Sequence, residues 1–378
     1  MKFGHLERIG ARLRTLAPVY IGSGEHLNKK EYILDGPKGL IHFPDFPRMV
    51  GFLKQRSLLA AYENFLTNPN RRDFRAFLEE NNVRASEYPH FVSYSIEAGE
   101  AARDVNFREV LTFIKDSRGF PYIPGSSLKG AIRTAVAAEM VRKGDWEQQR
   151  LSVERADDSK SPRWYMDTET KDLEKRVFYR LGITNPRDGR EIANAVNDLM
   201  QGIRISDSDP IGFESLTLAG KYDRKPDGTV NLLPIFRECI MPGTEARFTI
   251  TLDTPVLNRA GLDVGRIEGA LKSFADDHYA NFEQHFRELP DDADTSANNG
   301  VDIILGGGTG YPSKTIMYNL FEKRERALPV VARLMYKQFG RHQHGKDVTY
   351  YRVSPHTLKA TMYKGASYQM GRCELIFG

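Results

Sequence analysis

The chain has 378 residues, which is too long for one average domain and favours two domains of roughly 150–200 residues. Hydrophobic residues make up 40% and charged residues 28%, a balance typical of a globular protein with a buried core, and the net charge of +4 allows local basic surfaces. No apolar run approaches the ~18 residues of a membrane-spanning helix, so these numbers exclude the membrane-protein class and predict no membrane partner.

The two cysteines, Cys239 and Cys373, are far apart in sequence. This spacing indicates neither a zinc knuckle nor a disulfide framework. Both lie in strand-like surroundings, so we expect buried thiols in a reducing compartment, the cytoplasm. The first residues contain no apolar segment of the signal-peptide kind.

The first expected element is a strand over 9–15, in which apolar residues alternate with Arg12 and Arg14. The run is expected to end in a turn at Gly22-Ser23-Gly24, because glycines free the backbone for unusual dihedral angles. Helices are predicted over 46–66 and 70–80.

The best-marked helix is predicted over 126–142, directly after a Pro-Gly break. Ser126 or Ser127 is expected to cap it. Lys129 and Arg133 are four residues apart and share one face. A helix start with free N–H groups and two nearby bases suits a phosphate, although an ordinary capped helix with solvated bases explains the same residues.

The remaining elements complete the expected chain order. We predict a helical insertion over about 144–200, strands over 203–206, 230–240, 246–252 and 301–305, helices over 262–286 and 314–339, and a last strand over 368–377. Strands and helices alternate without a regular βαβ repeat. This favours an α+β protein with antiparallel sheets, divided into residues 1–215, with the insertion, and 216–378.

A glycine-rich loop, Gly306-Gly307-Gly308-Thr309-Gly310, follows the strand over 301–305, and Lys314 comes shortly after it. A P-loop would need glycine directly before the lysine, where Ser313 stands, and Pro312 removes an N–H from the phosphate cradle. Nucleotide hydrolysis is therefore not expected. A loop whose backbone approaches RNA phosphates and a purely structural turn both remain open.

Bases and aromatic residues mix over 335–352. Such a mixture suits single-stranded RNA through charge and stacking, and equally suits a solvated hairpin with core tyrosines. His342 and His344 could form a metal or acid–base pair. Since no cysteine or acidic cluster stands nearby at ligand spacing, we predict a solvated pair.

Five segments together resemble a known family. The RAMP superfamily of CRISPR effector subunits has similar segments in the same order. The corresponding residues here are LRTLAPVYIGSGE (13–25), YIPGSSLKGAIR (122–133), RISDSDP (204–210), GTEARFTITLD (243–253) and the glycine-rich loop through Lys314. Their order and spacing, with YILD at 32–35, look most like the fifth subunit of the type III-A Csm effector complex.

That resemblance implies two ferredoxin-like, RRM-related domains and a non-catalytic RNA-binding subunit. It would cap the complex near the 3′ end of the CRISPR RNA and support RNA maturation and antiviral defence. Its implied partners are CRISPR RNA, the neighbouring backbone RAMP subunits and host nucleases that trim the RNA 3′ end. The alternative is a RAMP endoribonuclease that processes precursor CRISPR RNA with His342 or His344 as acid–base.

Candidate RNA-binding residues are those expected at glycine turns, at the capped helix start and among the nearby bases. They are Gly22, Ser23, Gly24, Lys29, Lys30, Ser126, Ser127, Lys129, Arg133, Gly306, Gly307, Gly308, Gly310 and Lys314. No catalytic residue, metal ligand or cofactor is assigned.

Overall fold

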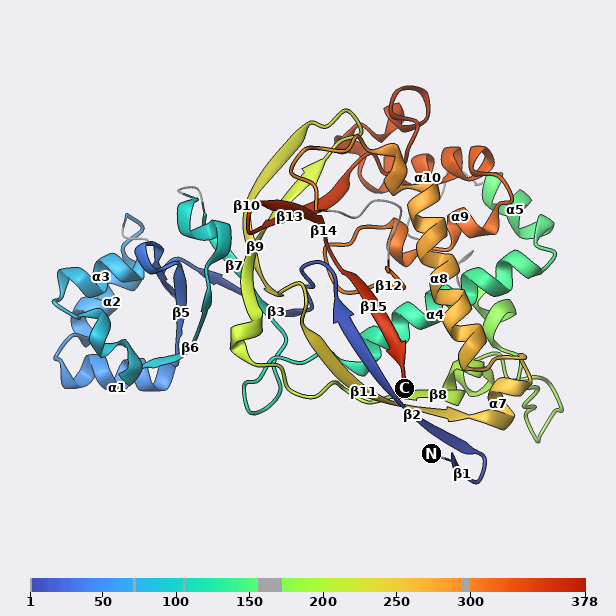
Figure 1. Cartoon of the computed structure of the whole chain (residues 1–378), viewed down its shortest axis with the longest axis horizontal. Coiled ribbons are helices and arrows are strands. Elements are labelled where there is room, and N and C mark those ends of the chain that lie inside the picture. Colours follow the sequence, from blue (N-terminus) through green and yellow to red (C-terminus); the bar gives the residue numbers. More distant parts are fainter. Residues whose placement is uncertain (1, 71–72, 105–106, 156–171, 294–299) are drawn as a thin grey trace.

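The computed structural model describes all residues except 1, 71–72, 105–106, 156–171 and 294–299. Its strands form two curved sheets, with helices packed beside them (Figure 1). The predicted α+β class is confirmed. Within the described part of the chain, no helix is long and apolar enough to cross a membrane.

The first sheet has the strand order β12-β15-β2-β11-β8, with β1 paired to β2, and every pairing is antiparallel. Its central strand, β2, buries Ala11 and Leu13 and exposes Arg12 and Arg14, which confirms the predicted alternation. The strands are β1 (Lys2–Phe3), β2 (Leu6–Thr15), β8 (Ile203–Ile205), β11 (Glu245–Asp253), β12 (Ile303–Ile304) and β15 (Arg372–Phe377).

The second sheet has the order β3-β7-β10-β9-β6-β5-β4, and β13 pairs with both β9 and β14. The β10–β7 and β6–β9 pairs are parallel and the others antiparallel. Its strands are β3 (Gly22–Asn28), β4 (Ile33–Asp35), β5 (Leu40–Pro44), β6 (Val92–Glu97), β7 (Glu109–Phe113), β9 (Leu216–Arg224), β10 (Val230–Ile240), β13 (Leu358–Tyr363) and β14 (Ala366–Gln369).

Both sheets combine strands from the two sides of residue 215. In the first sheet β2 pairs with β11 and β15, and in the second β7 pairs with β10. Each sheet is therefore completed only when strands from the second half of the chain pair with strands from the first half. The division into 1–215 and 216–378 stays a prediction.

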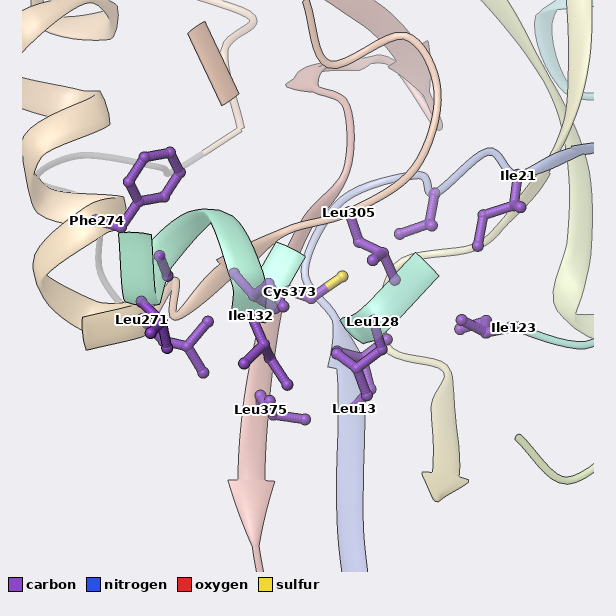
Figure 2. Close-up of a cluster of buried hydrophobic side chains, with 14 of the residues drawn as sticks. Leu13, Ile21, Ile123, Leu128, Ile132, Leu271, Phe274, Leu305, Cys373 and Leu375 are labelled. Carbon is purple, nitrogen blue, oxygen red and sulfur yellow. The ribbon is translucent and has the colours of Figure 1, made fainter. Parts of the chain in front are cut away.

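Two long helices, α4 (Gly125–Lys143) and α8 (Val264–Asn281), pack against each other and enclose the main core. Figure 2 shows Ile132 of α4 and Leu271 of α8 among the same buried side chains as Leu13 and Leu375 of the first sheet. Burial of such a side chain contributes on the order of 1.5–3 kcal/mol. The helices predicted over 126–142 and 262–286 are thus confirmed, the second ending earlier.

Three short helices form a separate cluster with its own apolar core, beside β5 and β6 at the left of Figure 1. They are α1 (Phe46–Gln55), α2 (Leu59–Thr67) and α3 (Phe74–Glu80). The single helix predicted over 46–66 is broken at Ser57, whose φ is +57°. Positive φ cannot continue a right-handed helix.

Other helices are α5 (Glu147–Glu154), α7 (Thr254–Asn258), α9 (Met317–Leu320) and α10 (Arg324–Gln338). In the predicted helical insertion, α5 and residues 172–178 are helical, much of 179–200 is irregular, and 156–171 lie outside the described residues. The helix predicted over 314–339 is divided between α9 and α10.

The single last strand predicted over 368–377 is wrong. The chain breaks at Met370-Gly371, where the φ of Gly371 is +85°, and leaves β14 in the second sheet for β15 in the first. Alternation of apolar residues does not reveal such a change of sheet. Cys239 and Cys373 are buried free thiols, as predicted.

Candidate functional site

The glycine-rich loop lies directly on the backbone of Tyr20. The N–H of Gly307 donates to the Tyr20 carbonyl at 2.6 Å, and a Cβ on Gly306 would lie 2.3 Å from the same oxygen. The φ angles of Gly306, Gly308 and Gly310 are +90°, +81° and +87°. Glycine is needed here both for the left-handed conformation and for close approach to another backbone.

Two cations approach this loop, and a third lies on the same face of the sheet near them. Alternation along the paired strands places Lys221 of β9, Arg237 of β10 and Lys359 of β13 on one face of the second sheet. A Cβ on Gly308 would lie 2.4 Å from Arg237 Nη1, and one on Gly310 would lie 3.6 Å from Lys359 Cγ. We call these three residues the cationic group.

The positive charges of the cationic group are only partly neutralised. Lys359 Nζ pairs with the carboxylate of Asp223 at 2.7 Å. The pKa of Lys221 is lowered, first by burial and then by the nearby charges of Lys359 and Arg237. An anion placed beside the loop would relieve this mutual repulsion. The sequence holds no local signal for the group, because only strand register brings the three residues together.

Gly22, Ser23 and Gly24 are exposed and begin β3, so the predicted turn is wrong. A β-bulge between Gly22 and His26 lets these glycines extend the strand irregularly. The ring of Tyr20 connects this segment with the glycine-rich loop. A Cβ on Gly22 would lie 2.3 Å from its hydroxyl, and one on Gly307 would lie 3.0 Å from its Cδ1.

The start of α4 differs from the prediction. Its N-cap is Pro124, so neither Ser126 nor Ser127 caps it, and both lie within the first turn. The N–H of Gly125 instead donates to the Asp207 carboxylate at 2.8 Å. A carboxylate at this position accepts a hydrogen bond from a free N–H of the first helical turn. Its negative charge also interacts favourably with the helix dipole, as a bound anion would.

Gly125 also allows two backbones to touch. A Cβ on it would lie 2.4 Å from the carbonyl oxygens of both Ile205 and Ser206. Next to it, Ile123 N–H donates to Ser208 Oγ at 2.9 Å. The segments 122–133 and 204–210, distant in sequence, therefore form one packed unit.

Arg133 is already engaged by acidic and aromatic groups. Its guanidinium contacts Glu174 at 2.5 Å and Asp198 at 2.8 Å, and lies 3.7 Å from the centre of the Phe178 ring. Lys129 is half-buried, and its pKa is lowered, mainly by burial. Arg133 and the exposed Lys314 line one cavity of about 270 Å³.

Lys30 Nζ donates to the carbonyls of Phe65, Leu66 and Asn68 at 3.0, 2.7 and 3.1 Å, so it caps the end of α2. A cation is favourable at a helix C-terminus. We expect Lys30→Ala to lower the free energy of unfolding by about 1.5–3 kcal/mol, measured by urea denaturation. Lys29→Ala is the control, with a change within about 0.5 kcal/mol. Equal losses in the two variants would contradict this capping role.

His342 is exposed, as predicted, but the prediction of a solvated pair is wrong for His344. His344 is buried, and its Nδ1 lies 2.9 Å from the fully buried carboxylate of Asp347. His356 Nδ1 and Ser354 Oγ each contact this carboxylate at 2.6 Å. The pKa of Asp347 is lowered: burial raises it, and the hydrogen bonds from the two histidines and Ser354 together outweigh burial.

The residues of this network could in composition also hold a divalent metal, since their ligand atoms lie within 4.8 Å of one another. Here the histidine Nδ1 atoms and the carboxylate oxygens face each other at hydrogen-bond distance. We therefore describe it as a hydrogen-bond network. The sequence pattern over 335–352 does not indicate this network, because His356 lies outside that segment and only the fold brings it to Asp347.

Around this network, several aromatic and basic side chains are exposed. Tyr336, Phe339 and Tyr350 are 55%, 46% and 68% exposed. They are not core residues, whereas Tyr351 is half-buried and stacks on His356. We call the following set the aromatic–basic surface: Tyr336, Phe339, Arg341, His342, Lys346, Tyr350 and Arg352.

Comparison with known proteins gives consistent matches. The sequence profile of the RAMP superfamily matches residues 12–311. The chain is 30% identical over 391 aligned residues to the CRISPR system Cms protein Csm5 of Mycobacterium tuberculosis, covering 98% of each chain. It is 33% identical over 318 residues to the protein of the same name from Streptococcus thermophilus, covering 80% of this chain and 78% of that one.

Two solved structures share the fold. A chain in a cryo-EM structure of a Csm–crRNA–target RNA ternary complex from a type III-A CRISPR-Cas system superposes with a TM-score of 0.62 at 22% identity, covering 98% of this chain and 100% of the other. The crystal structure of T. onnurineus Csm5 gives 0.61 at 20% identity, covering 96% and 99%.

Proposed function

The chain belongs to the RAMP superfamily and, within it, to the Csm5 family of type III-A CRISPR systems, and from this premise we propose that it is a non-catalytic subunit that binds CRISPR RNA. It would hold the RNA mainly through phosphates rather than through base identity, with sequence reading left to guide–target pairing.

The observation that carries this proposal is the cationic group beside the glycine-rich loop. Arg237 and Lys359 lie beside the loop, Lys221 interacts electrostatically with both, and Asp223 is the neighbouring carboxylate. Glycines with positive φ let a phosphate approach the backbone, and the cations supply the attraction. The aromatic–basic surface offers further stacking and charge for unpaired bases.

The predicted RNA-binding residues remain proposals, and their contacts support some of them better than others. Gly22 and the glycine-rich loop fit best, because both pack around Tyr20 beside the cationic group. Lys30 and Arg133 fit least, since other protein groups already hold their charges.

We also propose a position in the complex, which family membership supports. The subunit would cap the complex near the 3′ end of the CRISPR RNA, in the cytoplasm, and contact a neighbouring backbone RAMP subunit. Host nucleases would then trim the RNA end that the subunit leaves free. RNA footprinting in the assembled complex should show protection of 3′ nucleotides, and protection of the 5′ end alone would refute this position.

The alternative function is an endoribonuclease that uses His342 or His344. His342 is exposed and could reach a substrate, whereas His344 is buried against Asp347. Incubation of the purified protein with precursor RNA in chelator distinguishes the two functions. Cleavage that disappears in His342→Ala would establish the nuclease and remove the non-catalytic proposal.

Removing two of the cations should weaken RNA binding and its dependence on salt. For the double variant Lys221→Gln and Lys359→Gln, we expect the slope of log affinity against log salt to fall in magnitude by roughly 1.4, because each lost phosphate contact contributes about 0.7 with single strands. The measurement is RNA binding by fluorescence anisotropy across a salt series.

The control removes the same charge elsewhere, in Lys54→Gln with Lys143→Gln, both exposed residues. A salt slope that changes equally in both double variants would show that the glycine-rich loop is not the phosphate site.

A further inference from the structure

A second polar site lies on the opposite face of the strands that carry the cationic group. Alternation along β9 and β13 directs Arg224, Leu358 and Ala360 away from the glycine-rich loop. There, between the sheet and the segment after α8, is a cavity of about 670 Å³, which we call the β13 cavity. Its polar lining includes Arg224, Glu283, Asp292, Ser367, Gln369 and Arg372.

The buried charges of the β13 cavity balance one another. Arg224 Nη1 pairs with Asp292, and Arg372 pairs with Glu283. Burial lowers the pKa of Arg372 to about 10, so it is still charged at neutral pH. Burial lowers the pKa of His278, which lies behind Glu283, to about 3, so this histidine is neutral. The lining therefore holds no uncompensated buried charge that would call for an anionic ligand.

Two buried donors in this lining have no hydrogen-bond partner among the residues that the structure describes. They are Arg224 Nε and Gln369 Nε2, on residues that are each 7% exposed. The amide of Gln369 is oriented by Arg372, whose Nε donates to Gln369 Oε1 at 3.2 Å. An unsatisfied buried donor costs about 1–3 kcal/mol. The cavity is thus built to receive an acceptor.

The rest of the lining combines exposed polar residues, Gln284, Arg287 and Glu288, with apolar residues. Phe286 and Leu358 are buried and belong to one cluster with the half-buried Tyr351, next to the aromatic–basic surface. Tyr279 also lines the cavity. The apolar part of the lining, next to two fixed donors, suits a flat, uncharged ring that carries carbonyl and ring-nitrogen acceptors.

We propose that the β13 cavity binds a single unpaired nucleobase, which accepts hydrogen bonds from Arg224 Nε and Gln369 Nε2. The volume of about 670 Å³ lies in the range of small-ligand sites. This inference rests on the proposed RNA-binding function for the source of the base. RNA lying on the aromatic–basic surface would bring a base to the cavity past Tyr351.

The test measures binding of the four nucleoside 5′-monophosphates to the full chain by calorimetry, with inorganic phosphate in parallel. We expect at least one nucleotide to bind saturably and phosphate alone not to bind. Gln369→Met keeps the side-chain size and removes the donor, so it should weaken nucleotide binding about tenfold. Gln284→Met, the same change at an exposed position on the rim, should leave binding unchanged.

Ala293→Phe is the second variant, because it fills the cavity from the rim and keeps both donors. It should abolish nucleotide binding even if Gln369→Met folds poorly. Binding of phosphate as strong as that of any nucleotide, or no saturable nucleotide binding at millimolar concentration, would overturn the proposal.

RNA affinity of the same variants separates this inference from the proposed function. If the wild-type chain binds RNA with the expected salt slope but binds no nucleotide, the β13 cavity is not a base site and the proposed function stands. If nucleotides bind and RNA does not, the RNA-binding function fails and the base site stands.

Discussion

Replacing Gly125 with alanine is expected to lower the free energy of unfolding by about 2–4 kcal/mol. The new Cβ would lie 2.4 Å from the carbonyl oxygens of Ile205 and Ser206. Backbone atoms cannot rotate away as a flexible side chain can, so α4 or the 205–208 segment must move. That movement would strain the bonds from Gly125 to Asp207 and from Ile123 to Ser208. Urea denaturation followed by circular dichroism measures the change.

Gly130→Ala is the matched control in the same helix. Gly130 is exposed, and a Cβ there would meet nothing within 4 Å. Alanine should therefore stabilise α4 by about 0.5–1 kcal/mol through helix propensity. A Gly125→Ala protein as stable as Gly130→Ala would mean that the two segments do not pack as closely as described.

The second large effect is expected at the buried carboxylate of Asp347. Asp347→Ala should lower the free energy of unfolding by about 3–5 kcal/mol, because it leaves His344, Ser354 and His356 in the interior without their acceptor. Asp172→Ala, which breaks an exposed pair with Arg176, should change stability by less than about 0.5 kcal/mol.

The effect of Asp347→Ala on the free energy of unfolding should depend on pH in a defined direction. The pKa of Asp347 is lowered in the folded protein, so its carboxylate stabilises the fold fully above the ordinary aspartate value of about 3.9. The contribution disappears as pH falls through the lowered value. The stability difference between wild type and Asp347→Ala should therefore narrow below about pH 4. A difference that does not narrow there would show that the ionised carboxylate is not the stabilising group.

Local pattern predicted the regular elements well and the junctions poorly. The alternation of β2 and the apolar spacing of α4 are properties of short segments, so they can be read from the sequence. The carboxylate that accepts from the first N–H of α4 comes from Asp207, about 80 residues later, and no local rule favours it over Ser126 or Ser127. The change of sheet at Gly371 is likewise a tertiary event.

The candidate site shows the same division. The glycine-rich loop was recognised from composition, and its positive φ angles agree with that interpretation. Lys221, Arg237 and Lys359 were missed, because each stands singly in its own strand and only the register of β10, β9 and β13 makes them neighbours. Lys30 was predicted as an RNA-binding base. Its ammonium group instead donates to carbonyls at the end of α2, and no sequence pattern predicts this contact.

The pairing of β2 with β15 has a consequence for folding during synthesis. Ala11 lies opposite Phe377, and Leu13 opposite Leu375, so this interior pairing of the first sheet cannot form until more than 350 intervening residues have left the ribosome. At typical translation rates that takes on the order of tens of seconds. During this time the edge of β2 that will pair with β15 has unpaired backbone groups, and only its other edge can pair, with β11.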